Sequence, residues 1–186
     1  MAHGQGKLTC SDGNVYEGKW KDGESHGQGK YTFANGDIYE GEFELSMAHG
    51  QGKLTCSDGN VYEGEWKDDK ANGQGKKTWV NGNVYEGEWK DDKANGQGKY
   101  SFSNGGVHDG VWKDGLMNGQ GKKTYSGEKT YEMYEGEFQN DRLHGHGKHF
   151  LKTRFGSTLY EGEWKHGRRD GHGKLTFDNG RCLEGE

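Results

Sequence analysis

The sequence predicts an all-β fold: an elongated, twisted antiparallel meander of tandem 23-residue β-hairpin repeats. Three observations carry this prediction, namely a fixed period, a turn signal in most units, and many Gly and aromatic residues without any Pro. The tetrapeptide G-x-G-K recurs in steps of 23 residues, apart from two steps of 26. A repeat of this length is typical of an array of supersecondary units. The tetrapeptide starts at Gly4, Gly27, Gly50, Gly73, Gly96, Gly119, Gly145 and Gly171.

Each unit contains two short alternating runs separated by a polar turn, as in GKLTC, SDGN and VYEGEW. Asp-Gly or Asn-Gly between two such runs is a strong hairpin signal. Both three-residue insertions, in YSGEKTYEM (125–133) and KTRFGST (152–158), fall at this turn, where a loop tolerates added length. The segment KDDKANGQ is expected to be the return loop to the next hairpin, and the pairing register stays open because a Gly bulge could shift it.

The second run of each unit carries aromatic residues on one face. Side chains alternate between the faces of a strand, so Tyr62, Gly64 and Trp66 share a face, and the small Gly leaves room for neighbouring rings. Repetition turns these residues into an aromatic ladder, which we predict to be the partner-binding face. The aromatic ladder comprises Tyr16, Trp20, Tyr39, Phe43, Tyr62, Trp66, Tyr85, Trp89, Trp112, Tyr134, Phe138, Tyr160 and Trp164.

The opposite face is expected to be charged. A Lys closes each G-x-G-K, and we expect these cations to alternate across strands with the Glu of Y-E-G-E. The row consists of Lys7, Lys30, Lys53, Lys76, Lys99, Lys122, Lys148 and Lys174.

Composition bounds the class of protein. Only 27% of the residues are hydrophobic, and the mean hydropathy is -1.26, so the apolar runs are too short for a membrane span or a signal-peptide core. We therefore expect a cytoplasmic chain at the cytoskeleton, the cilium or the inner face of a membrane. The net charge of -5 disfavours nucleic acid as a partner.

The motif YEGEWKDxKxxGxGK resembles the MORN (membrane occupation and recognition nexus) repeat, and the resemblance covers essentially the whole chain in eight units. It implies an extended hairpin array that acts as a scaffold, often as a homodimer, in cytoskeletal, ciliary and membrane-associated assemblies. The sequence His108-Asp109-Gly110-Val111 departs from the Tyr-x-Gly pattern, which predicts an interruption of the ladder in the fifth unit.

We expect no catalytic residue, no cofactor and no metal site. Phosphate-binding glycines require a following helix, and no segment reads as one. His144 and His146 share a face, but a zinc site needs further converging ligands. Cys10 and Cys56 occupy the same slot two repeats apart, at about 19 Å for four strand spacings, which is too far for a disulfide, and Cys182 is a third cysteine.

One region is basic within an acidic chain. Between Asp141 and Lys174 there are eight basic and four acidic residues, which give this region a net charge of +4 and leave a net charge of -9 for the rest of the chain. This region is either a solvated end or a basic docking patch for an acidic protein or anionic lipid. The patch comprises Arg142, Lys148, Lys152, Arg154, Lys165, Arg168, Arg169 and Lys174.

Two functional hypotheses follow from these surfaces. The first is a non-catalytic scaffold whose aromatic face binds an apolar or helical protein segment. The alternative is peripheral membrane binding to anionic phospholipid through residues 141–174. Within the repeats, the variable segments KTWVN (77–81) and YSFSN (100–104) are better candidates for partner recognition than the invariant 18-residue segment found at 59–76 and 82–99.

We treat residues 1–186 as one repeat array whose first and last units are incomplete. Either the chain belongs to a longer array, or its end strands pair with other molecules, which predicts self-association by strand addition.

Overall fold

The computed structural model describes residues 1–186 and consists of sixteen β-strands. They divide into two compact units, Met1–Lys93 and Ala94–Glu186. None of the elements is a helix with the length and hydropathy that a membrane crossing requires.

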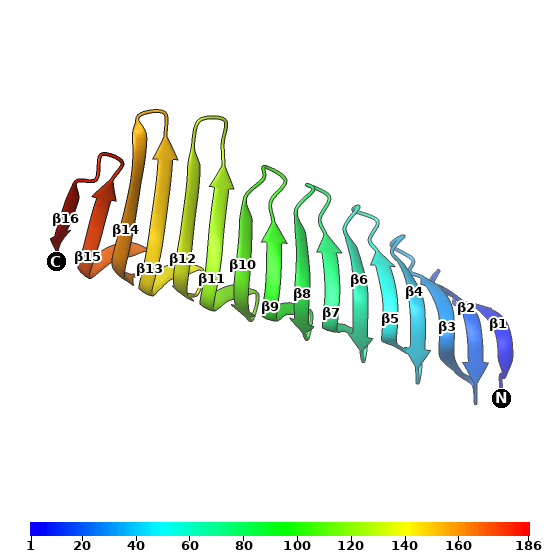
Figure 1. The fold of residues 1–186 in the computed structure, drawn as a ribbon. Coiled ribbons are helices and arrows are strands. Elements are labelled where there is room, and N and C mark those ends of the chain that lie inside the picture. Colours follow the sequence, from blue (N-terminus) through cyan, green and yellow to red (C-terminus); the bar gives the residue numbers. More distant parts are fainter. The chain divides into compact units, whose positions relative to one another are not determined.

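The first unit contains the first eight strands in chain order (Figure 1). Each strand pairs antiparallel with the next one, as a meander requires. The strands are β1 (Gly4–Thr9), β2 (Val15–Lys21), β3 (Glu24–Thr32), β4 (Ile38–Glu44), β5 (Met47–Thr55), β6 (Val61–Lys67), β7 (Lys70–Thr78) and β8 (Val84–Lys90).

The second unit repeats this arrangement, with longer hairpins where the two insertions lie. The prediction of an all-β antiparallel meander of hairpin repeats is confirmed in both units. The strands are β9 (Lys93–Ser101), β10 (Val107–Lys113), β11 (Leu116–Ser126), β12 (Tyr131–Gln139), β13 (Arg142–Thr153), β14 (Gly156–Lys165), β15 (Arg168–Phe177) and β16 (Cys182–Gly185).

The Asn-Gly and Asp-Gly signals mark the turn from an odd-numbered to an even-numbered strand, as predicted. Between β7 and β8, the Gly82 amide donates to the Trp79 carbonyl at 2.8 Å and the Trp79 amide to the Asn83 carbonyl at 2.9 Å. Gly82 has a φ of +83°, in the left-handed region. This is a type I turn followed by a Gly bulge, a common three-residue hairpin loop.

The expected return loop KDDKANGQ is wrong, because most of this segment is strand. β6 ends at Lys67 and β7 begins at Lys70, so only Asp68 and Asp69 form the turn. Both have positive φ, 50° and 65°, as a type I′ turn requires. The twist of this turn matches that of the flanking strands, so the chain needs no longer loop.

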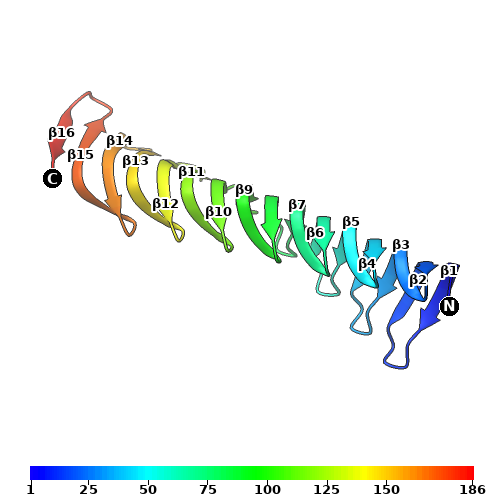
Figure 2. The same ribbon diagram turned by 90° about the horizontal axis from the view of Figure 1, so that it is seen from below.

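A bulge in the strand after each such turn settles the register that the sequence left open. In the pairing of β6 with β7, Gly64 faces Gly75 and Trp66 faces Ala71, so three residues of β7 lie opposite Glu65 alone. Gly73 adopts a φ of +68° there, and the Glu65 carboxylate accepts the Gln74 amide at 2.8 Å. Bulges bend strands, and the strands are visibly curved in Figure 2.

Hydrogen bonds between turns tie each hairpin to its neighbour. The Asp69 amide donates to the Ala48 carbonyl at 3.1 Å, and the Asp69 carboxylate accepts the Ala48 amide at 2.7 Å. At the other end of the strands, the Val80 amide donates to the Asn60 side chain at 3.0 Å. Each hairpin is therefore completed by the next one, as expected for a repeat array.

Candidate interaction surfaces

The aromatic ladder is a row of rings packed edge to face. Tyr62 contacts both Trp66 and Trp89, with ring centroids 5.1 Å apart in each pair and interplanar angles of 88° and 84°. The Trp66 indole donates to the Gly52 carbonyl at 3.0 Å. The Tyr62 hydroxyl donates to the Glu65 carbonyl at 3.0 Å, beside the bulge. These two rings therefore both pack against their neighbours and donate a hydrogen bond to a backbone carbonyl.

The glycines of the two repeat motifs make room for these rings. A Cβ atom at Gly75 would overlap the Tyr62 ring, and one at Gly64 would lie 2.5 Å from the Gln74 carbonyl oxygen. Only a residue without a side chain fits beneath a ring that lies flat on the backbone. The recurrence of Gly in both motifs is thus a packing requirement.

The structure buries twelve of the thirteen ladder rings at 1–8% exposure and leaves Trp20 half-buried. Burial raises the pKa of Tyr39, Tyr62 and Tyr85, and raises that of Tyr134 to about 12. Partner binding by the ladder itself stays a prediction. A protein that docks on this face would meet mainly the residues beside the rings.

The fifth unit interrupts the ladder, as its sequence predicts. His108 stands in the Tyr slot of β10, and Met117, 0% exposed, stands in the slot that holds Ala48 and Ala71 elsewhere. A Cβ atom at Gly121 would lie 2.6 Å from the Met117 Cε atom, where other units have a Tyr ring over Gly. Met117 therefore fills the space of the missing ring, an exchange that the repeat pattern did not predict.

The His108 side chain contacts two aromatic residues that lie beside the ladder, Phe102 and Tyr125. Its Nε2 atom lies 2.6 Å from the Tyr125 hydroxyl, and its ring packs edge-on against Phe102 with centroids 4.7 Å apart. Burial, followed by the charge of Lys123, lowers the pKa of His108 to about 4. This imidazole is therefore neutral at physiological pH.

A second row of side chains borders the ladder on the same face, and we name it the border strip. Half of these residues pair across strands with the Tyr position, as Leu54 pairs with Tyr62 and Tyr31 with Tyr39. The other half follow two residues later in the same segment and therefore lie on the same face. Unlike the ladder, the strip differs from repeat to repeat. It comprises Leu8, Cys10, Tyr31, Phe33, Leu54, Cys56, Lys77 and Trp79 in the first unit, and Tyr100, Phe102, Lys123, Tyr125, His149, Leu151, Leu175 and Phe177 in the second.

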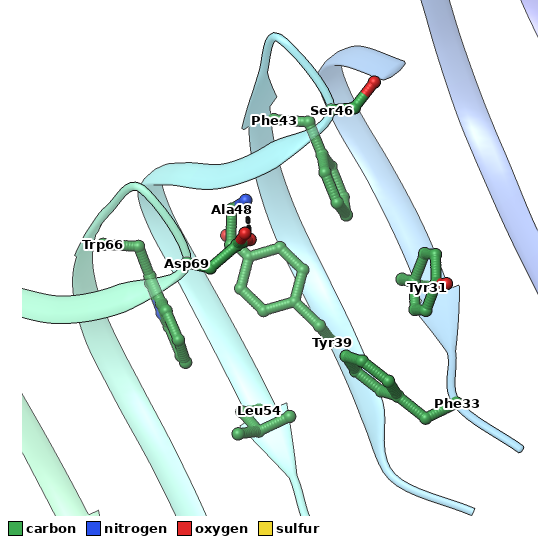
Figure 3. A pocket seen from close by; sticks show the side chains of 9 residues that line it. All are labelled: Tyr31, Phe33, Tyr39, Phe43, Ser46, Ala48, Leu54, Trp66 and Asp69. Carbon is green, nitrogen blue, oxygen red and sulfur yellow. Dashed lines mark hydrogen bonds between the residues drawn. The ribbon is translucent and has the colours of Figure 1, made fainter. Parts of the chain in front are cut away.

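The border strip forms one wall of a pocket of about 460 Å³ in the first unit (Figure 3). Tyr31, Phe33 and Leu54 line it from the strip, whereas Ser46 and Asp69 line it from the two-residue turns. Phe33 is 39% exposed although its ring contacts Tyr31 at 4.7 Å. The pocket thus offers accessible apolar surface above the buried rings.

On the opposite face, Lys and Glu alternate across strands as predicted. Salt bridges join five Lys–Glu pairs on well-exposed side chains, and such pairs contribute little to stability. The pairs are Lys7–Glu17 at 3.6 Å, Lys30–Glu40 at 3.2 Å, Lys122–Glu135 at 3.7 Å, Lys148–Glu161 at 2.7 Å and Lys174–Glu184 at 2.8 Å.

The basic docking patch is distributed over three places. Strand alternation puts Arg142, Lys148, Lys152, Lys165, Arg168 and Lys174 on the charged face. Arg169 lies on the ladder face, with its guanidinium 4.3 Å from the Tyr160 ring, and Arg154 lies at a hairpin tip. Docking through this whole set stays a prediction.

The histidines and cysteines are potential metal ligands, and the cysteines are potential disulfide partners. The structure contains no group of three or more His, Cys, Asp or Glu side chains placed to hold a metal ion. The His144 and His166 rings are 6.0 Å apart, and all three cysteines are free.

Comparisons with known proteins agree with the repeat geometry. The family model described as MORN repeat matches residues 1–15, 16–38, 39–61, 62–84, 85–107, 108–128, 134–150 and 160–180. No curated protein matches the sequence.

Two solved structures show weak similarity. The TCP domain of SAS-4 (dCPAP) from Drosophila melanogaster, solved with a proline-rich motif of Ana2 (dSTIL), aligns over 98% of this chain and 89% of that one, with 10% identity and a TM-score of 0.49. A virginiamycin B lyase from Staphylococcus aureus, solved with quinupristin, aligns over 99% and 71%, with 14% identity and a TM-score of 0.20.

Proposed function

This chain belongs to the MORN repeat family, and we propose that it is a non-catalytic scaffold that binds a protein partner along the border strip. MORN repeats are commonly modules for interaction with proteins or membranes. The proposal assigns recognition to the side chains beside the aromatic ladder.

One observation carries the proposal: on the ladder face, the repeating rings are buried, whereas the border strip, which varies more between repeats, lines an open pocket. Tyr62 and Trp66 are buried and hydrogen-bonded within the array. The position of Tyr31 and Leu54 holds Lys or His in some other repeats. With Phe33, these two residues line an open pocket. Accessible apolar surface of this kind often marks an interaction site.

The spacing of the strip supports a helical partner. Tyr31, Leu54 and Lys77 lie on alternate strands, so successive members are about 9.6 Å apart at two strand spacings. Seven residues of an α-helix rise about 10.5 Å. An amphipathic helix lying along the strip would therefore place an apolar side chain of every heptad near successive hairpins.

Comparative affinity capture tests this function. Proteins captured by the wild-type chain would be identified by mass spectrometry and compared with those captured by a Tyr31→Ser, Leu54→Ser variant. The matched control is Lys30→Ser, Lys53→Ser, which alters the charged face of the same strands. We expect the strip variant to lose a specific protein that the control retains. Equal capture of that protein by both variants would contradict the proposal.

The second candidate function is peripheral binding to anionic phospholipid through the 141–174 end. It is supported by the local charge of +4 and by the exposure of Lys152, Arg154 and Arg168, none of which makes a salt bridge. Co-sedimentation with anionic vesicles at two salt concentrations checks it, because electrostatic attraction to lipid weakens with added salt.

We also propose, on the family resemblance alone, that the chain works as a homodimer in a cytoskeletal, ciliary or membrane-associated assembly. Sedimentation velocity over a concentration series tests the self-association. A sedimentation coefficient that stays constant at the monomer value would contradict it.

A further inference from the structure

The hairpin formed by β13 and β14 ends in a tight, ordered tip. Thr153 pairs with Gly156, so Arg154 and Phe155 alone form the turn. The Phe155 amide donates to the Thr153 hydroxyl oxygen at 3.1 Å, and this hydroxyl donates to the Gly156 carbonyl at 3.3 Å. These bonds fix the backbone from which the two tip side chains project.

The insertion makes this hairpin longer than the regular ones (Figure 1). β13 spans 12 residues and β14 spans 10, compared with 9 and 7 for β9 and β10. About two further residues of extended chain carry the tip roughly 7 Å beyond the level of a regular loop. Phe155 lines an open pocket of about 250 Å³ with Phe177 and Asp178 of the neighbouring β15–β16 hairpin, so its ring lies beside that hairpin and still faces solvent.

The tip combines an exposed aromatic ring with unpaired cations. Phe155 is 83% exposed, and the Arg154 guanidinium lies 4.4 Å from its ring centroid. Lys152 is exposed on the adjoining strand. Neither basic side chain has a carboxylate within salt-bridge distance, so both remain available to an anion.

Neighbouring loops at the same end of the strands keep this region cationic. Lys129 lies in the β11–β12 turn and Arg181 in the turn before β16, and both are exposed. Together with Lys152 and Arg154 they make four basic residues, against two acidic ones, Glu128 and Asp178.

We propose that the β13–β14 tip inserts Phe155 into the interface of an anionic lipid bilayer while Arg154 and Lys152 contact lipid phosphates. This inference rests on the second candidate function and names the residues that would perform it. Aromatic rings favour the boundary between headgroups and acyl chains, and each basic residue near an anionic surface adds to the attraction.

A bilayer fits this tip better than a protein partner does. A stable protein interface buries about 800 Å² on each partner, whereas the turn presents two side chains on a projecting hairpin. Insertion into lipid needs no complementary surface, because the acyl region accommodates any apolar group of suitable depth. The β11–β12 hairpin provides an internal contrast, since its insertion ends in the polar residues 127–130.

Vesicle co-sedimentation tests the inference on the full chain. The probes are phosphatidylcholine vesicles with and without phosphatidylserine. We expect Phe155→Ser to weaken partitioning onto the anionic vesicles about tenfold, and Arg154→Gln about fivefold. The matched control is Val80→Ser, which removes a 72%-exposed apolar side chain from a regular turn in the first unit and should leave partitioning unchanged. Circular dichroism confirms that each variant is folded.

Insertion depth gives a second readout. Phe155→Trp should acquire fluorescence quenching by brominated phosphatidylcholine, mixed with phosphatidylserine, beyond that of the wild-type chain.

The possible outcomes separate the inference from the function on which it rests. Binding by the wild type that Phe155→Ser leaves unchanged would overturn the tip assignment and leave lipid binding by the charged face standing. No binding by the wild type would overturn both. Selective loss in the Phe155 and Arg154 variants, together with quenching in Phe155→Trp, supports the tip.

Discussion

The regular repeat around Tyr62 and the deviating repeat around His108 use different side chains to cover the glycine backbone of the neighbouring strand. In the first unit, a Tyr ring covers Gly75 and the facing slot holds the small Ala71. In the repeat of His108, the corresponding Tyr ring is absent, and Met117 reaches over Gly121 from the slot that faces it. In the deviating repeat, the slot residue therefore takes over the space of the missing ring. The slot is not restricted to Ala where the ring is present, since it holds Leu143 beside Tyr134 and Arg169 beside Tyr160.

Transplanting the deviating pair into the regular repeat tests whether the ring and the slot residue are coupled and should give the largest effect. Tyr62→His removes a buried ring and the donor to the Glu65 carbonyl, and we expect a loss of about 3 kcal/mol of unfolding free energy. Ala71→Met alone should cost about 1–3 kcal/mol by overpacking. The double variant should be more stable than the sum predicts, by about 1 kcal/mol or more in urea unfolding. Additive costs would show that the two positions are independent.

The second comparison adds a methyl group beneath the Tyr62 ring in one repeat and beneath the Met117 side chain in the other. Gly75→Ala would force its Cβ atom into the rigid Tyr62 ring, with an expected cost of about 3 kcal/mol. Gly121→Ala should cost less, because the nearest atom belongs to the flexible end of Met117. Thermal unfolding of the two variants measures the difference, and an equal or reversed order would refute the assigned roles of ring and methionine.

The deviating repeat should also respond to acid. Because the pKa of His108 falls from its ordinary value of about 6.5 to about 4 on folding, the unfolded chain takes up the proton first. His108 therefore lowers stability progressively as the pH falls through about 6.5 toward about 4. In His108→Phe, which keeps a ring but does not titrate, the loss of Tm between about pH 7.5 and pH 5 should be smaller than in the wild type. An unchanged loss would assign the acid sensitivity to other groups.

The smallest effect is expected at a turn of the regular unit. Leu45 is the first residue of a type I′ turn, with a φ of 49° and 63% exposure. Residues with a branched side chain are strained in this region, whereas Asn tolerates it. We expect Leu45→Asn to stabilise the chain by about 1 kcal/mol, and Leu45→Ala, which stays strained, to change little. Urea unfolding measures both.

Sequence patterns predicted the features that depend on alternation and on turn chemistry. The two faces and the Lys–Glu rows follow from which residues lie two apart, whereas the Asn-Gly turns follow from the tolerance of Gly for a left-handed φ, and the structure places all of them accordingly. The return loop was wrong because alternation cannot reveal a bulge. The bulge depends on the left-handed φ of Gly73 and on the Glu65 carboxylate that accepts the Gln74 amide, which is a tertiary contact.

The burial of the ladder rings could not be predicted from the sequence either. A single sheet leaves its faces open, and only the edge-to-face packing of Tyr62 with Trp66 and Trp89 shows that the rings cover one another. The large residue at Met117 could have been noticed in the sequence, since alignment of the repeats places it at the position that holds Ala48 and Ala71. Phe155 lay within a recognised insertion, but its exposure required the tip geometry.

The bonds between Asp69 and Ala48 bear on how this gene can change in length. Asp92 bonds to Ala71 as Asp69 bonds to Ala48, with the same atoms at nearly the same distances. An in-frame deletion of 23 codons would therefore bring Asp92 to Ala48 and leave every seam chemically matched. Loss or gain of one 23-residue repeat between the identical segments 59–76 and 82–99 would thus remove or add one two-stranded hairpin whose bonds to its neighbours match those already present.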